Sequence, residues 1–201
     1  MATLKLSKEL LDAMRAAGEA VVENSRTDQL YGVRAGYPVL AAWPSISCSV
    51  VFLDFDGVLN SDRSTQELGT RYRFSRASVA AFNLVLRETE ARIVISSSWR
   101  EHWTLKENAQ FLERDGVLPG RVIGKTPTLD GSERGREIDA WLAAVPYSVK
   151  SFVIIDDRDD MAMHSERLVR VDPAVGITDR QASLAVEILV KPWTPRTTKT
   201  G

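Results

Sequence analysis

Three apolar runs of the sequence stop abruptly at acidic or hydroxyl side chains, and this feature restricts the fold more than any other. They are "SVVFLD" at 49–54, "ARIVIS" at 91–96 and "SFVIID" at 151–156. Each run is continuous and rich in β-branched and aromatic residues, as expected of a strand that is buried on both faces. Strands of this kind belong to parallel sheets covered by helices, so the runs predict an α/β protein.

Helical patterns separate these strands, and further elements follow the third one. Thr178 and Gln181 have the spacing of a capping box in front of a final helix. The alternation of strands and helices predicts a Rossmann-like three-layer α/β/α sandwich with a mostly parallel sheet and right-handed crossovers. We expect helices at 75–90, 105–116, 132–145 and 180–189, a short strand at 121–124 and a fourth buried strand at 167–172.

The N-terminal part of the chain does not share this pattern. Residues 7–23 have apolar side chains at helical spacing behind Ser7, a good N-cap, and predict a helix that packs on the domain or joins two subunits of a homo-oligomer. Residues 24–46 have no clear period and are interpreted as a connection or an arm that packs on the main domain. The chain is therefore divided into an N-terminal helix and arm (1–48), an α/β domain (49–190) and a flexible tail (191–201).

Composition narrows the function classes. The chain has 201 residues, of which 44% are hydrophobic, and this is enough for one well-filled core. A net charge of -1 excludes a global basic field that would attract nucleic acid or an anionic membrane. One cysteine and two histidines leave no intramolecular disulfide and argue against a Cys/His zinc site. Because we find no signal peptide and no membrane-spanning segment, we expect a cytoplasmic protein without a membrane partner.

The acidic residues at the strand ends predict a metal site. Carboxyl ends of parallel strands meet at the edge of the sheet where α/β proteins bind ligands, so Asp54, Asp56, Asp156 and Asp157 should lie close together. Carboxylates at such distances raise one another's pKa values, and a divalent cation relieves the repulsion. Oxygen ligands without histidine favour Mg²⁺ over zinc. The acids at 159–160 are expected to cap a helix or to face solvent.

Three segments resemble motifs of the haloacid dehalogenase (HAD) superfamily. "FLDFDGVL" is similar to the first motif, an apolar strand followed by DxDG, "IVISSSWR" is similar to the second, and "FVIIDD" to the fourth. The resemblance covers about residues 49–176, and it extends to the capless HAD domains of nucleic-acid repair proteins, in which "SSSW", "TP", "REI..WL" and "IDD" also occur. It implies an HAD-like fold and a Mg²⁺-dependent phosphatase that forms an aspartyl-phosphate.

The resemblance also implies a role for the residues of the first and fourth motifs. Asp54 would be the nucleophile, and Asp56 would protonate the leaving oxygen and then accept a proton from the attacking water. Residues i and i+2 of an extended segment point to the same side, so both can face one phosphate. Gly57 would turn the backbone beside the substrate with a positive φ. Mg²⁺ would be held by Asp54, the main-chain carbonyl of Asp56, Asp156 and Asp157.

Two further family positions leave alternatives in this sequence. The serine that binds a phosphoryl oxygen is Ser97 by its place in the second motif, with Ser96 one residue away as the alternative. The cation of the third motif, usually a lysine in the family, would neutralise the transferring phosphoryl group. Arg134 is our first choice for this cation, and Lys125 and Arg136 are the alternatives.

The residues after the second motif begin a helix beside the expected site. Ser98 should cap this helix at the substrate side. Trp99 could stack on a nucleobase, with Arg100 near a phosphate. The alternative is that Trp99 belongs to the core, which is our interpretation for Trp103.

The spacing of the motifs bears on the substrate. The stretches between Asp56 and Ser97, and between Ser97 and Arg134, are largely filled by one helix and one strand each. No folded cap domain fits there, so the site is expected to be open to the end of a macromolecule. A polynucleotide 3′-phosphate, a nucleotide or a phosphoprotein is then the expected partner. The alternative function is a non-catalytic module that accepts phosphate, such as a receiver, although a receiver carries its acid pair on the first strand.

Overall fold

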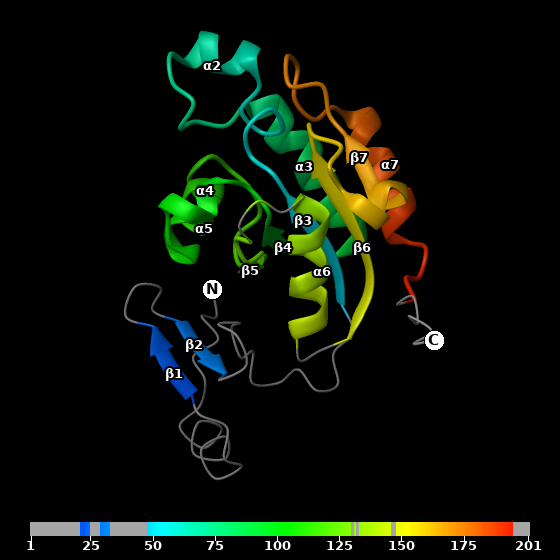
Figure 1. Ribbon diagram of the computed structural model, residues 1–201. Helices are drawn as coiled ribbons and strands as arrows, with labels where there is room; N and C mark the ends of the chain where they lie inside the picture. Colours follow the sequence, from blue (N-terminus) through cyan, green and yellow to red (C-terminus); the bar gives the residue numbers. More distant parts are fainter. Residues whose placement is uncertain are drawn as a thin grey trace.

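The computed structural model describes residues 21–24, 29–32, 48–129, 131, 133–145 and 148–194. Its main feature is a five-stranded sheet in which every pair of neighbouring strands is parallel (Figure 1). In sheet order the strands are β5 (Val122–Lys125), β4 (Arg92–Ile95), β3 (Cys48–Leu53), β6 (Val149–Asp156) and β7 (Leu168–Arg170). The predicted parallel sheet is thus confirmed, including its short strand β5. The predicted fourth strand, β7, is present, but it lies at the edge of the described sheet and only Val169 of its three residues is buried.

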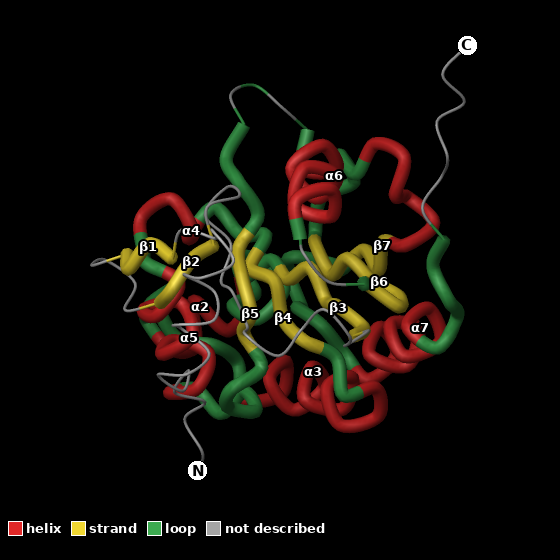
Figure 2. Tube along the Cα trace, turned by 90° about the horizontal axis from the view of Figure 1, so that it is seen from below, coloured by secondary structure: helices red, strands yellow, loops and turns green. Residues whose placement is uncertain are grey.

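Helices cover both faces of the sheet and produce the predicted three layers. Figure 2 shows α3 (Arg76–Thr89) and α7 (Asp179–Leu189) on one side of the strands and α6 (Arg134–Ala144) on the other. Helix α5 (Leu105–Arg114) packs into the same hydrophobic core as α3 and α7. Alternate residues of the central strands enter the two cores: Val51 and Leu53 face α3 and α7, and Val50 and Phe52 face α6.

Local sequence signals explain where these helices begin. Ser75 caps α3 by accepting a hydrogen bond from the N–H of Ser78, and the apolar side of the helix is fully buried. Burial of each large apolar side chain contributes about 1.5–3 kcal/mol to the stability of the packed layers. The capping box of Thr178 and Gln181 in front of α7 is confirmed.

The N-terminal prediction is wrong where the structure describes it. Strand β1 (Val21–Asn24) pairs antiparallel with β2 (Gln29–Gly32), so the end of the predicted helix at 21–23 is a strand and the predicted connection contains a second strand. Val21 and Val22 are β-branched, and pairing with another strand outweighs the fit of Val21 to the helical period. The remainder of the predicted helix, at 7–20, and most of the flexible tail lie outside the described residues.

Three short helical elements have no clear periodic signal, and α2 is the one that affects the site. Helix α2 (Asp62–Leu68) is capped by Ser61 and ends at Gly69, whose φ of 66° suits glycine. It lies at the top of the molecule in Figure 1. We name residues 60–74 the α2 lobe. It is much smaller than a folded cap domain. The other two elements are α4 (Trp99–His102) and the 3₁₀ helix η1 (Ala162–Arg167).

Within the described part of the chain, every helix is too short or too polar to cross a lipid bilayer.

Candidate active site

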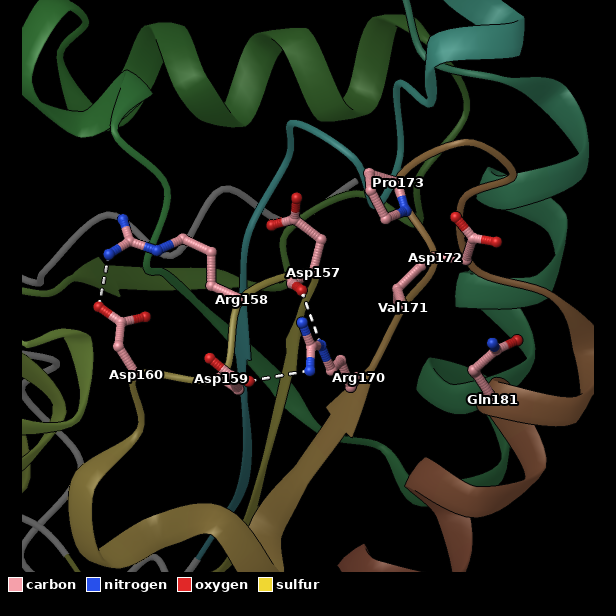
Figure 3. A pocket seen from close by; sticks show the side chains of 9 residues that line it. All are labelled: Asp157, Arg158, Asp159, Asp160, Arg170, Val171, Asp172, Pro173 and Gln181. Atoms are coloured by element: carbon pink, nitrogen blue, oxygen red, sulfur yellow. Dashed lines mark hydrogen bonds and ion pairs between the residues drawn. The ribbon is translucent and has the colours of Figure 1, made fainter.

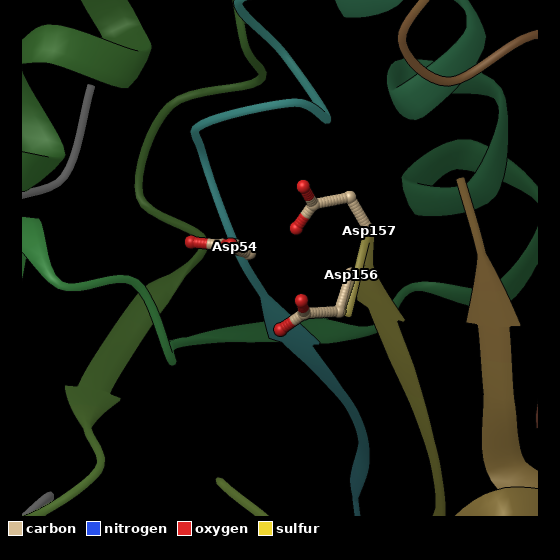
Figure 4. A group of neighbouring side chains, drawn as sticks. All are labelled: Asp54, Asp156 and Asp157. Carbon is tan, nitrogen blue, oxygen red and sulfur yellow. The ribbon is translucent and has the colours of Figure 1, made fainter. Parts of the chain in front are cut away.

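The acidic cluster forms where the two central strands end. Asp54 follows β3 directly, Asp156 is the last residue of β6, and Asp157 comes next. Leu53 lies opposite Ile155 in the parallel register, so Asp54 and Asp156 are neighbours across the strands. Carboxylate oxygens of the three aspartates lie within 4.8 Å of one another, and Figure 4 shows the side chains of Asp156 and Asp157 extending from the end of β6 toward Asp54. Three buried or half-buried carboxylates therefore share one small volume.

Arg134 places a positive charge next to this cluster. Its Nη1 lies 2.8 Å from Asp156 Oδ2 and 3.3 Å from Asp54 Oδ2, and only 6% of the residue is exposed. Arg134 is the first residue of α6, so the start of that helix determines where the guanidinium lies.

Two contacts hold the start of α6 in place. Asp160 Oδ2 accepts a hydrogen bond from the main-chain N–H of Arg134, and the carbonyl of Asp160 accepts one from Gly135. A Cβ on Gly135 would lie 2.2 Å from the carbonyl oxygen of Met161, so only glycine allows this close approach. The expectation that the acids at 159–160 act as caps or face solvent is confirmed, because Asp160 caps α6 and Asp159 is exposed and paired with Arg170.

The cluster changes the ionisation of its own members. Burial raises the pKa of Asp54, against the opposing effects of Arg134, of a hydrogen bond from Ser97 and of the Phe55 N–H. Burial and the neighbouring Asp54 raise the pKa of Asp156 to about 8, although Arg134 opposes the shift. Burial would lower the pKa of Arg134, but the Asp54 and Asp156 carboxylates together raise it. One arginine therefore does not fully compensate the carboxylates, and a divalent cation fits this donor set.

This imbalance predicts how the stability of the metal-free protein depends on pH. The folded-state pKa of Asp156 lies above its ordinary value of 3.8, at about 8, so its contribution to stability is complete below the ordinary pKa and is lost as the pH rises through about 8. In EDTA, the unfolding temperature should fall between about pH 5 and pH 8, and added Mg²⁺ should restore more of it at the upper end.

Thermal unfolding at a series of pH values, with EDTA and with Mg²⁺, measures this effect. Asp156→Asn is the control, because the amide does not titrate and should flatten the EDTA curve. A wild-type curve that is as flat as that of Asp156→Asn contradicts the prediction.

Asp56 lies beside the cluster and is held by three donors. Its Oδ1 accepts a hydrogen bond from Asn60 Nδ2 at 2.7 Å, and its Oδ2 accepts from Arg71 Nη2 at 2.9 Å and Trp99 Nε1 at 3.0 Å. The predicted positive φ of Gly57 is confirmed at 74°. A Cβ on Gly57 would lie 2.8 Å from Asp157 Oδ2, so glycine also leaves space for a cluster carboxylate.

The serines of the second motif occupy different environments. Ser97 is fully buried next to Asp54, and its hydrogen bond lowers the pKa of that carboxyl. Ser96 is also fully buried, and its hydroxyl has no hydrogen-bond partner among the described residues. Ser98 is exposed at the start of α4, where its side chain makes no capping hydrogen bond. Of the three, Ser97 is therefore the serine that the structure connects to the cluster.

Arg100 and Lys125 belong to a separate group next to the site. Arg100 is buried, and its Nη2 lies 2.5 Å from Glu137 Oε2. Lys125 donates a hydrogen bond to the main-chain carbonyl of Arg100 at 2.8 Å. Burial and the nearby Arg100 charge lower the pKa of Lys125. Arg136 is exposed on α6, so among the three candidate cations Arg134 is the one that pairs with the acidic cluster.

Trp99 is buried rather than open to a ligand. It is 4% exposed, and its indole N–H points at Asp56. The ring of Tyr72 packs on it with centroids 5.6 Å apart. Neither Tyr72 nor Arg71 was among the predicted site residues, because the loop after α2 has no periodicity and no motif that could have singled them out.

Two pockets flank the cluster. A cavity of about 790 Å³ borders Asp157, and Figure 3 shows ion pairs between Arg158 and Asp160 and between Arg170 and Asp159 along its wall. A smaller one of about 290 Å³ reaches Arg134 from the other side. The larger pocket is lined by Asp157, Arg158, Asp159, Asp160, Arg170, Val171, Asp172, Pro173 and Gln181.

Comparison with known families decides the classification. A family model described as the HAD domain in Swiss Army Knife RNA repair proteins matches residues 50–182. The chain belongs to this HAD family. The predicted resemblance to HAD domains of nucleic-acid repair proteins is thus confirmed, and the match includes every residue of the acidic cluster and Arg134. Comparisons of the chain with curated proteins and with solved structures gave no match.

Proposed function

We propose that this HAD domain is a Mg²⁺-dependent phosphatase that removes a terminal phosphate from a nucleic acid through an aspartyl-phosphate on Asp54. The observation that carries the proposal is the cluster of Asp54, Asp156 and Asp157 around one small space, with Arg134 in contact with two of the three. Such a set of fixed charges suits phosphoryl transfer, in which catalysis depends on positioning and electrostatic stabilisation.

The donor set fits the metal. Asp54, Asp156 and Asp157 would hold Mg²⁺, because all three offer oxygen ligands and burial raises the pKa of two of them. The main-chain carbonyl of Asp56 is our fourth proposed ligand. When bound, the ion would neutralise negative charge on the phosphoryl group.

The protein groups then divide the reaction into two displacements. A carboxylate oxygen of Asp54 forms a bond to phosphorus as the bond to the leaving oxygen breaks, and Asp56 gives that oxygen its proton. Water next attacks the phosphorus of the aspartyl-phosphate, Asp56 accepts the proton of the water, and inorganic phosphate leaves with Asp54 restored. Ser97 and Arg134 would hold the phosphoryl oxygens during both steps.

Family membership and the open site support a nucleic-acid substrate. The matching family model describes HAD domains of RNA repair proteins. Both pockets beside the cluster open on the surface, and the α2 lobe after the first motif is too small to enclose a substrate. A terminal phosphate of a polynucleotide, with the 3′ end as our first choice, could therefore approach the acidic cluster through the pockets that Asp157 and Arg134 line.

Phosphate release measures this function. The purified protein should release inorganic phosphate from p-nitrophenyl phosphate and from 3′-phosphorylated oligonucleotides in the presence of Mg²⁺. EDTA should abolish the release, and excess Mg²⁺ should restore it. Release that is insensitive to EDTA contradicts the proposed metal, and the absence of release from every substrate contradicts the proposed reaction. A stable phosphorylated Asp54 without turnover would instead support a non-catalytic module that accepts phosphate.

A further inference from the structure

Two exposed side chains, Arg71 and Tyr72, stand beside Asp56 on the loop that follows α2. Arg71 Nη2 lies 2.9 Å from Asp56 Oδ2, while 59% of its side chain remains exposed. Tyr72 is 51% exposed, and its ring packs on Trp99 at an interplanar angle of 58°. Neither residue belongs to the acidic cluster, and the chemistry proposed for Asp54 does not need either of them.

The backbone of this loop is fixed on both sides, so the two side chains project from a rigid support. Asn60 Nδ2 donates a hydrogen bond to the carbonyl of Arg71 at 2.7 Å, and Arg114 donates one to the carbonyl of Tyr72. Asp115 then binds the next two residues of the loop through Arg73 Nε and the main-chain N–H of Phe74, both at 2.8 Å. A loop held in this way can present a binding surface with little loss of conformational entropy.

An aromatic cluster supports Tyr72 from below. The Trp99 ring lies 5.4 Å from Phe55, 5.8 Å from Phe74 and 5.6 Å from Phe111, measured between ring centroids. These three residues surround the indole, and Tyr72 covers it toward solvent. Tyr72 is therefore a half-exposed aromatic ring on a packed base, which is the arrangement that stacks nucleobases.

The chemistry of Asp56 indicates which part of a substrate reaches this loop. If Asp56 protonates the leaving oxygen, the leaving group must extend from the side of the phosphate that Asp56 occupies. Arg71 and Tyr72 lie on that side, because Arg71 touches the Asp56 carboxylate directly. In a nucleic acid, the leaving group carries a base next to its oxygen and a phosphodiester one nucleotide further.

We infer that Arg71 and Tyr72 form a leaving-group subsite, in which Tyr72 stacks on a base and Arg71 binds the first internal phosphodiester. The inference rests on the proposed phosphatase function and names its substrate class, an oligonucleotide end rather than a mononucleotide. Guanidinium groups pair strongly with phosphate oxygens, and aromatic rings stack on any base, so the subsite recognises a nucleic-acid end without reading its sequence.

Four substrates separate the two contacts. They are β-glycerol phosphate, a nucleoside monophosphate, a dinucleotide with a terminal phosphate, and the same dinucleotide with an uncharged methylphosphonate linkage. For the wild-type protein, kcat/KM should rise about tenfold from the mononucleotide to the dinucleotide and should lose that gain with the methylphosphonate. Equal kcat/KM for the mononucleotide and the charged dinucleotide overturns the inference and leaves the phosphatase function standing.

Variants assign each contact to its residue. Arg71→Gln should lower kcat/KM about tenfold more for the charged dinucleotide than for the methylphosphonate dinucleotide, because any effect through Asp56 is common to both substrates. Tyr72→Ala should lower kcat/KM about tenfold more for each of the three nucleotide substrates than for β-glycerol phosphate, which has no base to stack. Arg63→Gln and Leu68→Ala, two exposed changes in the same lobe, are the matched controls. If Arg71→Gln lowers kcat/KM equally for β-glycerol phosphate and the dinucleotide, Arg71 only positions Asp56 and the subsite is disproved.

Binding provides a readout that does not depend on turnover. In an Asp54→Asn background, Arg71→Gln and Tyr72→Ala should each weaken the binding of a fluorescent, terminally phosphorylated oligonucleotide about tenfold. Arg71→Gln should also reduce the slope of log affinity against log salt by about 0.7, the value for one phosphate contact on a single strand. Unchanged affinity in both variants contradicts the subsite, whereas a wild-type protein that binds the oligonucleotide but hydrolyses none of the substrates contradicts the proposed function instead.

Discussion

Replacing Asp54 with asparagine is expected to lower the rate of phosphate release by about 10⁴-fold, because the amide cannot form the aspartyl-phosphate. The neighbouring groups stay in place, since Arg134 keeps its 2.8 Å contact with Asp156 and the β3–β6 register does not depend on the side chain at this position. The variant should therefore lose the reaction and keep the fold.

Measurements of stability distinguish loss of the nucleophile from loss of the fold in this variant. Burial raises the pKa of Asp54, so the folded protein disfavours the ionised carboxylate that the substitution removes. In EDTA at about pH 8, Asp54→Asn should unfold at the same temperature as the wild type or at a higher one. Asp159→Asn is the matched control, because it changes an exposed aspartate near the cluster and should keep wild-type activity. If the Asp54→Asn protein is folded and retains more than about a tenth of the wild-type rate of phosphate release, Asp54 is not the nucleophile.

The central strands of the sheet were predictable from the sequence because they are buried on both faces. Alternate residues of β3 enter two different cores, and this requires the continuous apolar runs that the sequence displays. The acidic cluster was predictable for the same reason. Neighbouring parallel strands end at the same edge of the sheet, so Asp54 and Asp156 lie close together regardless of the conformation of the loops.

The contacts that loops make were not predictable in this way. Arg71 reaches Asp56 over 15 residues of sequence. Its position depends on a hydrogen bond that Asn60 donates to its carbonyl and on one that Asp115 accepts from the N–H of Phe74, and no periodicity reveals either bond. In the structure, the indole N–H of Trp99 also donates a hydrogen bond to Asp56. The sequence indicated only a ring that could stack on a base or belong to the core, and did not predict this hydrogen bond. The strands and helices thus determine where the proposed reacting groups lie, whereas the loops determine which side chains surround them.

The role of Arg134 could be predicted only in part from the sequence. Its charge type could be predicted from the family, but the choice among Arg134, Lys125 and Arg136 depended on how α6 begins. Asp160 and the narrow space at Gly135 fix the first turn of α6 against η1, so that the first side chain of the helix points into the cluster. The side chain two residues later is exposed. A difference of two positions on a helix therefore separates a buried counter-charge from a surface residue.

Removal of the Arg134 side chain is expected to have the second large effect. Arg134→Ala should lower kcat/KM by about 10²–10³-fold, because a fixed positive charge beside the transferring phosphoryl group is lost. It should also destabilise the metal-free protein by about 3–5 kcal/mol at about pH 9, where Asp156 is ionised in the wild type and the buried carboxylates lose their partner in the variant. Arg134→Lys should recover part of both losses, since it keeps the charge but not the two-carboxylate contact.

The pH dependence of this loss tests its electrostatic origin. With a pKa already near 8 in the presence of Arg134, Asp156 should bind a proton still more readily when the arginine is absent. The destabilisation caused by Arg134→Ala should therefore be larger at about pH 9 than at about pH 6, because only above about pH 8 does Asp156 ionise in the wild type and gain from its pairing with Arg134. Mg²⁺ should shrink the difference at about pH 9 by supplying positive charge. Chemical denaturation at both pH values, with and without Mg²⁺, measures these differences, and Arg136→Ala on the same helix should show none of them. A loss of stability that is equal at about pH 6 and about pH 9 would mean that Arg134 acts through packing, in which case Arg134→Lys should be as unstable as Arg134→Ala.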